Sequence, residues 1–288
     1  MFLSAIIITR NEAPNIARCL HSLQGIADEV IVIDSDSEDG TAAICQDWGA
    51  RVYQHAFAGY GPQKRMAAAY ATGDWLLSID ADEALSPALQ QSILALKQTA
   101  PGAAAFEVNR LTNYCGKWIR HGGWYPDRLI RLWKKDAGNI SNDAVHESWQ
   151  PGQGKVVIGH LKGDLLHYSF PTLESHLKKV TQYARIGAES DYKSGKRVSL
   201  LKLWLGPKLA WWQQFVMKRG FLDGYYGFII AKNSAFAAFA KYALLRELQK
   251  RKKAALPLQP SGPRSTMDSI RVSEAPDPGS IPGEATKP

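Results

Sequence analysis

The chain has 288 residues, of which 45% are hydrophobic and 10% aromatic, and its formal net charge at pH 7 is +8. This composition excludes an intrinsically disordered protein and predicts one or two folded domains. The cysteines Cys19, Cys45 and Cys115 are odd in number and widely spaced. They indicate reduced thiols and argue against a disulfide framework or a zinc site. The first residues lack the basic region that opens a signal peptide, so we expect a cytosolic protein.

Six apolar runs of β-strand character occupy the first 135 residues. Runs that no polar residue interrupts, such as Ala5–Ile8 and Val30–Ile33, are typical of parallel strands covered by helices on both faces. The predicted strands are Leu3–Thr9, Glu29–Ser35, Arg51–His55, Trp75–Asp80, Ala104–Thr112 and Arg128–Lys134.

Helical patterns separate these strands. Apolar residues repeat at helical spacing over residues 16–23 and again over residues 89–96. Ser86 precedes the second helix as a favourable N-cap, and Pro87 suits its first turn. This alternation predicts an α/β fold with a Rossmann-like sheet, in which ligands bind at the carboxyl ends of the strands.

The composition changes beyond about Pro171. Residues 172–194 are predicted to form a long polar helix, and residues 199–253 a helical segment that is basic and rich in aromatic side chains. Residues 196–253 contain thirteen lysines and arginines against two acidic residues, a net charge of +11. The chain beyond Ala255 is rich in proline, serine and glycine and is predicted to be disordered. The sequence thus predicts three parts, over residues 1–170, 171–255 and 256–288.

Polar residues gather where the predicted strands end, at residues 9–12, 34–36 and 80–83. Asp80 and Asp82 follow the fourth predicted strand, and two carboxylates at this spacing can converge on a hard cation such as Mg²⁺ or Mn²⁺. Such a cation would neutralise the charge that grows on a departing diphosphate. The same spacing also fits a solvated acidic loop. Neither G-x-G-x-x-G nor a P-loop motif occurs, which argues against dinucleotide and P-loop binding.

Three blocks of this sequence, at residues 5–12, 30–41 and 73–83, resemble the family 2 glycosyltransferases of GT-A fold. They occur in the family's order and at suitable separations, and the resemblance covers residues 1–150. It implies a GT-A domain with a Rossmann-like mixed sheet flanked by helices, which binds a nucleotide sugar and catalyses its transfer. The helical, basic and aromatic region would then be a C-terminal extension of that domain.

A narrower resemblance is to the bacterial lipopolysaccharide-core β-1,4-glucosyltransferases. It is carried by Ile79–Glu83, Tyr125–Leu132 and Val145–Glu147. It implies an inverting, metal-dependent transfer of a hexose, glucose from UDP-glucose in the first place, to the inner core of lipopolysaccharide. Another lipid-linked or surface polysaccharide acceptor is the alternative.

The resemblance also implies a uridine pocket. Thr9 and Asp34 would contact the uridine, and Arg10 and Glu12 would line the same pocket. A carboxylate at Asp34 can accept a hydrogen bond from the imide N–H of uracil. The family's usual Asp-Asp-Gly-Ser is replaced here by residues 34–37, Asp-Ser-Asp-Ser, so the second acidic position of the pattern is missing. The alternative for Asp34 is an ordinary turn former at a strand end.

An inverting transfer needs a base that takes the proton of the acceptor hydroxyl. Glu147 falls where the family has this acid, after the acceptor loop, and Asp127 is its competitor. His146 could complete a metal shell begun by Asp80 and Asp82, because imidazole suits Mn²⁺ better than Mg²⁺. A structural contact between His146 and Glu147 is the alternative.

Lys64 opens the predicted helix that precedes the fourth strand. A cation at that position could reach the diphosphate of the donor. A solvated surface charge is an equally good interpretation.

Residues 199–253 combine aromatic and basic side chains in the manner of an interfacial membrane anchor. Tryptophans at the headgroup level, with lysines and arginines toward anionic lipid, would hold the protein on the cytoplasmic side of the inner membrane. Because lysines interrupt the apolar stretches, we do not expect this region to span the bilayer. A buried helical subdomain is the main alternative. Binding to nucleic acid is the weaker interpretation beside an enzyme-like first half, and we expect no nucleic-acid partner.

Two other classes of protein share features with this chain. Phosphatases of the haloacid dehalogenase type also have D-x-D at a strand end, but on their first strand and with Thr or Val two residues beyond it. Here D-x-D follows the fourth predicted strand, and Ala84 stands at that position. A non-catalytic module that binds a sugar or lipid is the second alternative, whereas a glycosidase would need no such acidic pair.

Overall fold

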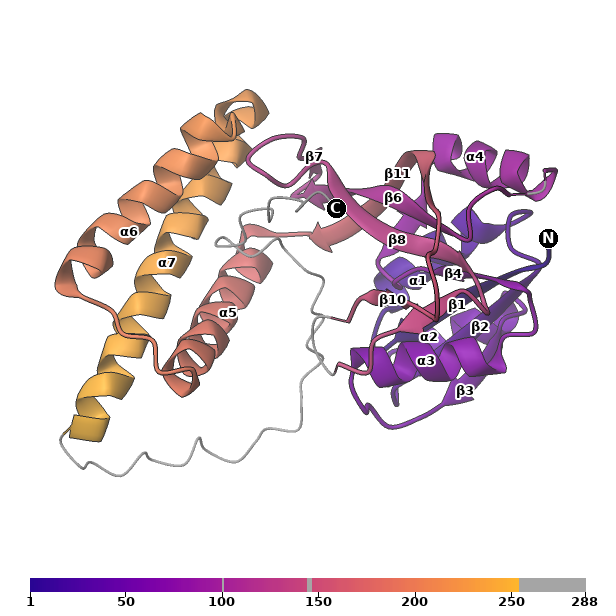
Figure 1. Cartoon of the computed structure of the whole chain (residues 1–288), viewed down its shortest axis with the longest axis horizontal. Coiled ribbons are helices and arrows are strands. Elements are labelled where there is room, and N and C mark those ends of the chain that lie inside the picture. Colours follow the sequence, from indigo (N-terminus) through magenta and orange to yellow (C-terminus); the bar gives the residue numbers. More distant parts are fainter. Residues whose placement is uncertain (100, 144–146, 254–288) are drawn as a thin grey trace. The chain divides into compact units, whose positions relative to one another are not determined.

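The structure is a computed structural model, and it describes residues 1–99, 101–143 and 147–253. His146 and the predicted Pro-rich tail lie outside these residues. The chain forms two compact units (Figure 1). Among the described residues, the first comprises Met1–Thr112 and Pro126–Ser169, and the second comprises Asn113–Tyr125 and residues 170–253. The loop that contains Trp124 therefore groups with the C-terminal helices.

The first unit is built on a mixed sheet with strand order β3-β2-β1-β4-β8-β6-β11-β5. The first four strands of this order are parallel, β8 is antiparallel to both β4 and β6, and β5 is antiparallel to β11. The strands are β1 (Leu3–Thr9), β2 (Glu29–Asp34), β3 (Arg51–Gln54), β4 (Trp75–Ser78), β5 (Glu83–Leu85), β6 (Ala105–Tyr114), β8 (Asp127–Lys134) and β11 (Ile158–Phe170). A separate small sheet joins β9 (Gly138–Ile140) to β10 (Trp149–Pro151), and β7 (Lys117–Trp118) pairs with the end of β6.

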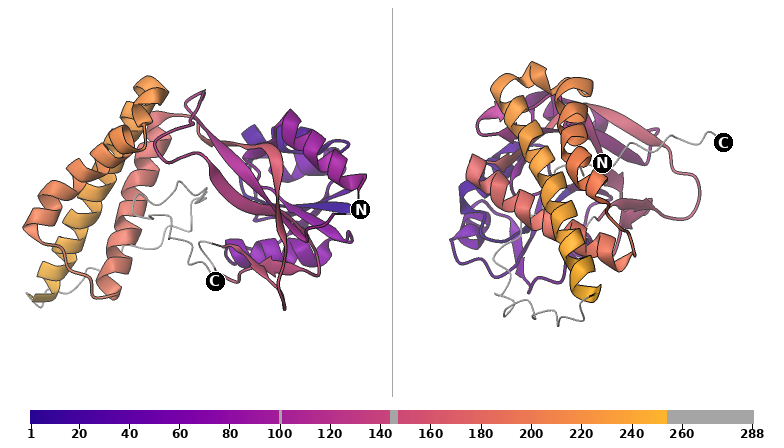
Figure 2. Two further views of the ribbon diagram at one scale, coloured as in Figure 1. Left: turned by 45° about the horizontal axis from the view of Figure 1, so that its top comes forward. Right: turned by 90° about the vertical axis from the view of Figure 1, so that its left-hand side faces the viewer.

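Helices cover both faces of this sheet, because successive side chains of each strand point to opposite sides. Ile7 in β1 packs with Leu20 and Ile93 on one face, whereas its neighbour Ile6 packs with Ala67 on the other. The helices of this unit are α1 (Ala13–Leu23), α2 (Thr41–Asp47), α3 (Tyr60–Tyr70) and α4 (Pro87–Lys97). In the left view of Figure 2, α3 lies below the sheet and α1 and α4 lie above it. The predicted α/β fold, a mixed sheet flanked by helices, is confirmed.

The local predictions for this unit hold in detail. All six predicted strands are present, with ends that shift by a residue or two. The predicted cap of α4 is also confirmed, because the Ser86 hydroxyl accepts a hydrogen bond from the backbone N–H of Leu89. Each large apolar side chain that these elements bury fully, such as Leu20, stabilises the fold by about 1.5–3 kcal/mol.

The second unit consists mainly of three long helices. They are α5 (Leu173–Lys193), α6 (Leu200–Trp212) and α7 (Gly224–Lys253), with a π-helical turn at Gln213–Met217 and a 3₁₀ turn at Gly220–Asp223 between the last two. Helix α7 packs against both α5 and α6 (Figure 1). Helix α5 begins with a capping box in which Thr172 and Ser175 exchange hydrogen bonds. The predicted helical extension is therefore present.

One stretch of the described helices, Gly220–Arg251, is long and apolar enough to cross a membrane by length and composition, with a mean hydropathy of 1.2 in its most apolar window. The lysines therefore leave one stretch that meets this criterion, and the expectation that the region does not span the bilayer stays a prediction. Only 22% of that window is buried within the structure.

Candidate active site

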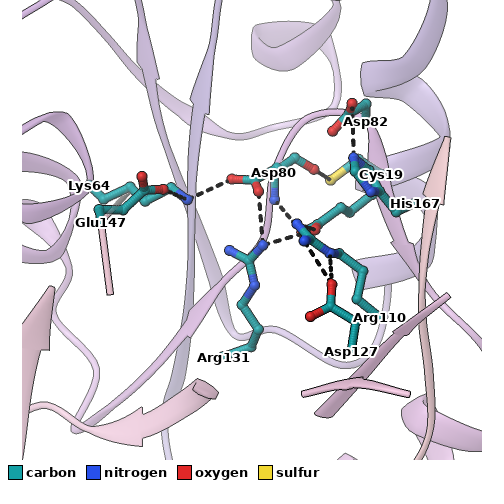
Figure 3. A network of polar contacts seen from close by, with 10 residues as sticks. Cys19, Lys64, Asp80, Asp82, Arg110, Asp127, Arg131, Glu147 and His167 are labelled. Atoms are coloured by element: carbon teal, nitrogen blue, oxygen red, sulfur yellow. Dashed lines mark hydrogen bonds and ion pairs between the residues drawn. The ribbon is translucent and has the colours of Figure 1, made fainter. Parts of the chain in front are cut away.

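Asp80, two residues beyond the end of β4, lies at the centre of a largely buried ionic network (Figure 3). Its Oδ1 is 2.9 Å from Lys64 Nζ, and its Oδ2 is 2.9 Å from a guanidinium nitrogen of Arg131. Burial disfavours the charged form of Asp80, but the cations of Arg131 and Lys64 outweigh it and hold the pKa of the carboxyl well below its usual range. Asp80 is therefore a carboxylate at all ordinary pH values.

Lys64 joins Asp80 to Glu147, the predicted base. The lysine stands in the first turns of α3, is buried, and places Nζ 2.6 Å from Glu147 Oε1. Burial alone would lower the pKa of Lys64, but Asp80 and Glu147 raise it above its usual value. The alternative of a solvated surface lysine is thereby excluded.

A second branch of the network leads from Asp80 to Asp127, the other predicted base. Glu83 Oε2 accepts a hydrogen bond from the backbone N–H of Asp80 (2.9 Å), and Glu83 Oε1 lies 2.9 Å from Arg131. Arg110 reaches the same Glu83 oxygen at 3.9 Å and donates from two nitrogens, each at 2.8 Å, to Asp127 Oδ2. Burial raises the pKa of Glu83, and the charge of Asp80 adds to this while Arg131 opposes it.

Asp82 points away from this network toward His167 of β11 (Figure 3). The Nε2 atom of His167 lies 3.4 Å from Asp82 Oδ2. The imidazole is only 1% exposed, and neither of its nitrogens has a hydrogen-bond partner among the described residues. A buried imidazole with both nitrogens unsatisfied is costly unless something binds it.

The residues of the predicted uridine pocket lie at the carboxyl ends of β1 and β2. Thr9 and Asp34 are register partners in these strands. Asp34 is fully buried and accepts hydrogen bonds from the backbone N–H and the hydroxyl of Ser37, at 3.0 Å and 2.5 Å. The Thr9 hydroxyl is buried and has no partner in the part of the chain that the structure describes. Asp34 thus does form a strand-end turn, and the buried Thr9 hydroxyl beside it is a polar group whose hydrogen bond no described residue satisfies.

The two remaining pocket residues, Arg10 and Glu12, follow β1. Glu12 is buried, donates its backbone N–H to the Thr41 hydroxyl, and accepts a hydrogen bond from the side chain of Asn15. Asn11, between them, has a left-handed backbone with φ of 53°. This conformation turns the chain away from the sheet and into α1, so that residues 9–12 edge the same end of the sheet as Asp80.

Part of this set of side chains fits a divalent metal. Asp82 and the unsatisfied His167 offer one carboxylate and one imidazole side by side, both of which are suitable ligands for Mn²⁺. Each oxygen of Asp80 lies beside a cation, so a metal bound to Asp80 would be repelled by Lys64 and Arg131 unless one of them moved. No three His, Cys, Asp or Glu side chains of the described residues are already arranged as a metal site. Asp82 and His167 fit a metal, and Asp80 does so conditionally.

The buried thiol of Cys19 takes no part in this chemistry. Its Sγ lies 3.5 Å from the backbone oxygen of Asp80. Burial, followed by the charges of Glu83 and Asp80, raises the pKa of the thiol well above its usual value. A thiol that stays protonated is neither a nucleophile nor a metal ligand.

The structure therefore brings together Asp80, Lys64, Glu147 and Asp127 in one network, with Asp82 beside it. Sequence reasoning missed the groups that connect them: Arg110, Arg131, Glu83 and His167. Trp124 lies apart from this network: it is 5% exposed and packs against Tyr114 and Phe170 in the second unit.

Comparison with known proteins identifies the family. The model of glycosyl transferase family 2 matches residues 4–150. An uncharacterized glycosyltransferase of Rickettsia typhi is 34% identical over 256 residues, which cover 85% of this chain and 87% of that protein. The lipopolysaccharide core biosynthesis glycosyltransferase LpsC of Rhizobium meliloti is 30% identical over 244 residues, 82% of this chain and 89% of that one.

Among solved structures, the mannosyltransferase PcManGT from Pyrobaculum calidifontis, in complex with GDP-Man and Mn²⁺, has a TM-score of 0.44 at 17% identity. That match covers 90% of this chain and 81% of the other. The family match spans half of this chain and every residue of the site described above except His167, and the relatives match along most of their length. The chain belongs to glycosyl transferase family 2 and is a glycosyltransferase.

Proposed function

We propose that this glycosyltransferase moves a hexose, in the first place glucose from UDP-glucose, onto the inner core of lipopolysaccharide with inversion at the anomeric carbon. The observation that carries the proposal is the buried network in which Lys64 joins Asp80 of the D-x-D motif to Glu147. It sets a diphosphate-binding cation and a candidate base side by side. The relative LpsC is named a lipopolysaccharide core biosynthesis glycosyltransferase, and this supports the lipopolysaccharide core as the acceptor.

The donor would bind at the carboxyl ends of the parallel strands. Asp34 would accept the imide N–H of uracil, Thr9 would supply the hydroxyl that now lacks a partner, and Arg10 and Glu12 would line the pocket. Lys64 would turn from Asp80 and Glu147 toward the diphosphate, whose anionic oxygens also accept charge-assisted hydrogen bonds from an ammonium group.

We further propose that Asp82 and His167 hold a Mg²⁺ or Mn²⁺ ion, with Asp80 as a third ligand. Its chemistry would be to neutralise the charge of the leaving diphosphate. His146, the ligand predicted from the sequence, lies outside the described residues and remains a candidate. His167 is supported by its unsatisfied nitrogens and its distance of 3.4 Å from Asp82.

Glu147 is the preferred base for the acceptor hydroxyl. Asp127 is held through two N–H groups of the planar guanidinium of Arg110, an arrangement with fixed geometry. Glu147 is held by the single ammonium group of Lys64, which is a flexible point charge that the donor diphosphate can attract. Binding of the donor would therefore release Glu147 while Asp127 stays bound.

The acceptor class and the place of action belong to the same proposal. The basic C-terminal region, at +11, suits the anionic cytoplasmic face of the inner membrane, where a lipid-linked acceptor is found. Another lipid-linked or surface polysaccharide is the alternative acceptor. Membership of glycosyl transferase family 2 rules out the haloacid-dehalogenase and non-catalytic alternatives.

A donor panel measured by calorimetry tests the proposal. UDP-glucose should bind the protein with Mn²⁺ present and bind much more weakly in EDTA, whereas GDP- and ADP-sugars should bind weakly under both conditions. Turnover should then occur on truncated lipid-A–core acceptors. Tighter binding of a GDP- or ADP-sugar would contradict the proposed donor, and full turnover in EDTA would contradict the metal.

A further inference from the structure

Helix α6 is apolar around most of its circumference, yet none of its residues is buried. Leu201, Trp204 and Leu209 are 68%, 70% and 64% exposed. Together with Leu200, Leu205 and Trp212 they form two adjacent rows at helical spacing along the outer side of the helix. A helix of this composition is normally buried in a core or in a membrane. These exposed apolar side chains therefore require a binding partner that the second unit itself does not supply.

The charges beside this apolar row are all positive. Residues 200–222 contain Lys202, Lys208, Lys218 and Arg219 and no acidic residue. Lys208 Nζ lies 5.8 Å from the ring centroid of Trp204, so cation and ring share one surface. Apolar side chains with only cations among them complement an anionic lipid surface, in which acyl chains lie beneath phosphates.

The apolar surface continues around the corner that joins α6 to α7. Met217, Leu222 and Tyr225 are exposed there, Met217 by 69%. The buried carboxylate of Asp223 holds this corner, because it accepts the backbone N–H groups of Arg120 and His121. The exposed apolar residues therefore lie on a fixed corner.

Helix α7 is the competing membrane element, because it is long and apolar enough to cross a bilayer. However, α7 packs against α5, and Lys241 of α7 forms an ion pair of 3.1 Å with Asp191 of α5. The rest of α5 is polar, with exposed charges that include Lys178 and Glu189. A spanning α7 would either carry these charges into hydrocarbon or lose its packing against α5, and both are costly. The contacts of α7 thus favour a role as support for α6.

We propose that residues 200–222, which are α6 and the corner after it, lie in the interface of an anionic phospholipid bilayer without crossing it. Leucine and tryptophan side chains enter the acyl region, and the four cations bind lipid phosphates. This inference rests on the membrane association in the proposed function and assigns it to one helix. A second copy of this chain is the other covering that such a surface could take.

Sedimentation with phosphatidylglycerol-containing vesicles tests the assignment. The variant Leu201→Ser/Leu205→Ser/Leu209→Ser should lose vesicle binding about tenfold or more, because it removes exposed apolar groups and no core contacts. The control is Leu173→Ser/Leu177→Ser/Ile186→Ser, which changes three apolar residues of α5 that are 39%, 40% and 47% exposed. It should bind like the natural protein. Equal losses in both variants, or no loss in the first, would overturn the assignment.

Two further measurements separate the proposal from its rivals. Alkaline carbonate should release the bound protein from vesicles, whereas resistance to extraction would show a spanning α7 and overturn it. Analytical ultracentrifugation should give the same mass for the natural protein and the α6 variant. The proposal would be overturned if the natural protein were a dimer, the α6 variant a monomer, and neither of them bound vesicles. That result would show that a second copy of the chain covers α6.

Failure of this inference can be told apart from failure of the proposed function. The α6 variant should transfer hexose to a water-soluble truncated acceptor at the natural rate, because α6 holds none of the proposed site residues. If the natural protein binds anionic vesicles through α6 but transfers no hexose to any core acceptor, the proposed function fails and the α6 assignment stands. If transfer occurs and vesicles are ignored, the α6 assignment fails alone.

Discussion

Lys64 Nζ lies 2.6 Å from Glu147 Oε1, although 83 positions separate the two residues in the chain. The same ammonium group lies 2.9 Å from Asp80, so one buried lysine holds both the D-x-D motif and the preferred base. Two carboxylates therefore share one ammonium group. A donor diphosphate would have to compete for Lys64, and success would free Glu147 for the acceptor.

Replacement of the base separates chemistry from binding. Glu147→Gln should bind UDP-glucose about as well as the natural protein, while transfer falls by roughly 10²–10⁴-fold because the proton acceptor is gone. Single-turnover rates and calorimetry on one preparation measure the two effects. Asp127→Asn is the matched comparison. If it alone shows intact binding with lost transfer, Asp127 is the base and the assignment is reversed.

Removal of Lys64 should lower the stability of the folded protein. Lys64→Ala leaves Asp80 and Glu147 without a shared cation, and the free energy of unfolding should fall by roughly 3 kcal/mol, as expected when a buried ion pair loses one partner. Lys134→Ala provides the control, because its pair with Asp136 is exposed and is worth about 1 kcal/mol at most. Urea unfolding measures both variants. Equal effects would show that Lys64 is not the structural link described here.

Metal binding can be measured without any turnover. We expect Asp82→Ala and His167→Ala each to weaken Mn²⁺ binding, detected by electron paramagnetic resonance of the free ion, because each removes one proposed ligand. Asp136→Ala, a change to an exposed acid of the same unit, should leave binding unaltered. Unchanged Mn²⁺ affinity in His167→Ala would exclude this histidine as a ligand and return attention to His146.

The second unit should lose stability in mild acid. Burial, assisted by the charge of Lys179, lowers the pKa of His176 from 6.5 to about 4. The unfolded chain therefore binds a proton in this range that the folded chain does not, so stability falls as pH drops from about 6.5 to about 4. The loss should amount to about 3 kcal/mol. The ring accepts at Nδ1 from the Tyr114 hydroxyl or Asn233, at 2.8 Å and 2.9 Å, which requires the neutral form.

His176→Gln should flatten this part of the pH profile, because it removes the titrating ring and keeps a hydrogen-bonding side chain. Thermal unfolding of both proteins at several pH values between 4 and 7 makes the comparison. An equally steep profile in the variant would assign the acid sensitivity to other groups.

The core of the fold was predictable from sequence because its strands are unbroken apolar runs. The apolar run that forms β4 gives way to acidic residues in the sequence. Its end therefore predicts that Asp80 and Asp82 lie at the edge of the sheet, as the structure has them. Strand β11 was missed because His160, Lys162 and Gly163 interrupt its pattern. Strand β5 was missed because a segment of three residues is too short to show the alternation of apolar and polar residues that marks a strand.

The connecting groups of the site were not predictable in the same way. Arg110 and Arg131 stand within strands, where a charged residue is usually taken to face water, and their partners lie elsewhere in the chain. His167 lies opposite Glu83 in the pairing of β11 with β5, and one sequence does not give that register. The role of a buried polar residue can be inferred only when the position of its partner in the fold is known.

The most direct test of the account is transfer from UDP-α-glucose to a truncated lipid-A–core acceptor, with the product's anomeric coupling read by nuclear magnetic resonance. We expect a β-linked glucose that forms with Mn²⁺ or Mg²⁺, does not form in EDTA, and is absent with Asp82→Ala. An α-linked product, or equal yield from Asp82→Ala in EDTA, would contradict inverting transfer at the metal-binding D-x-D site.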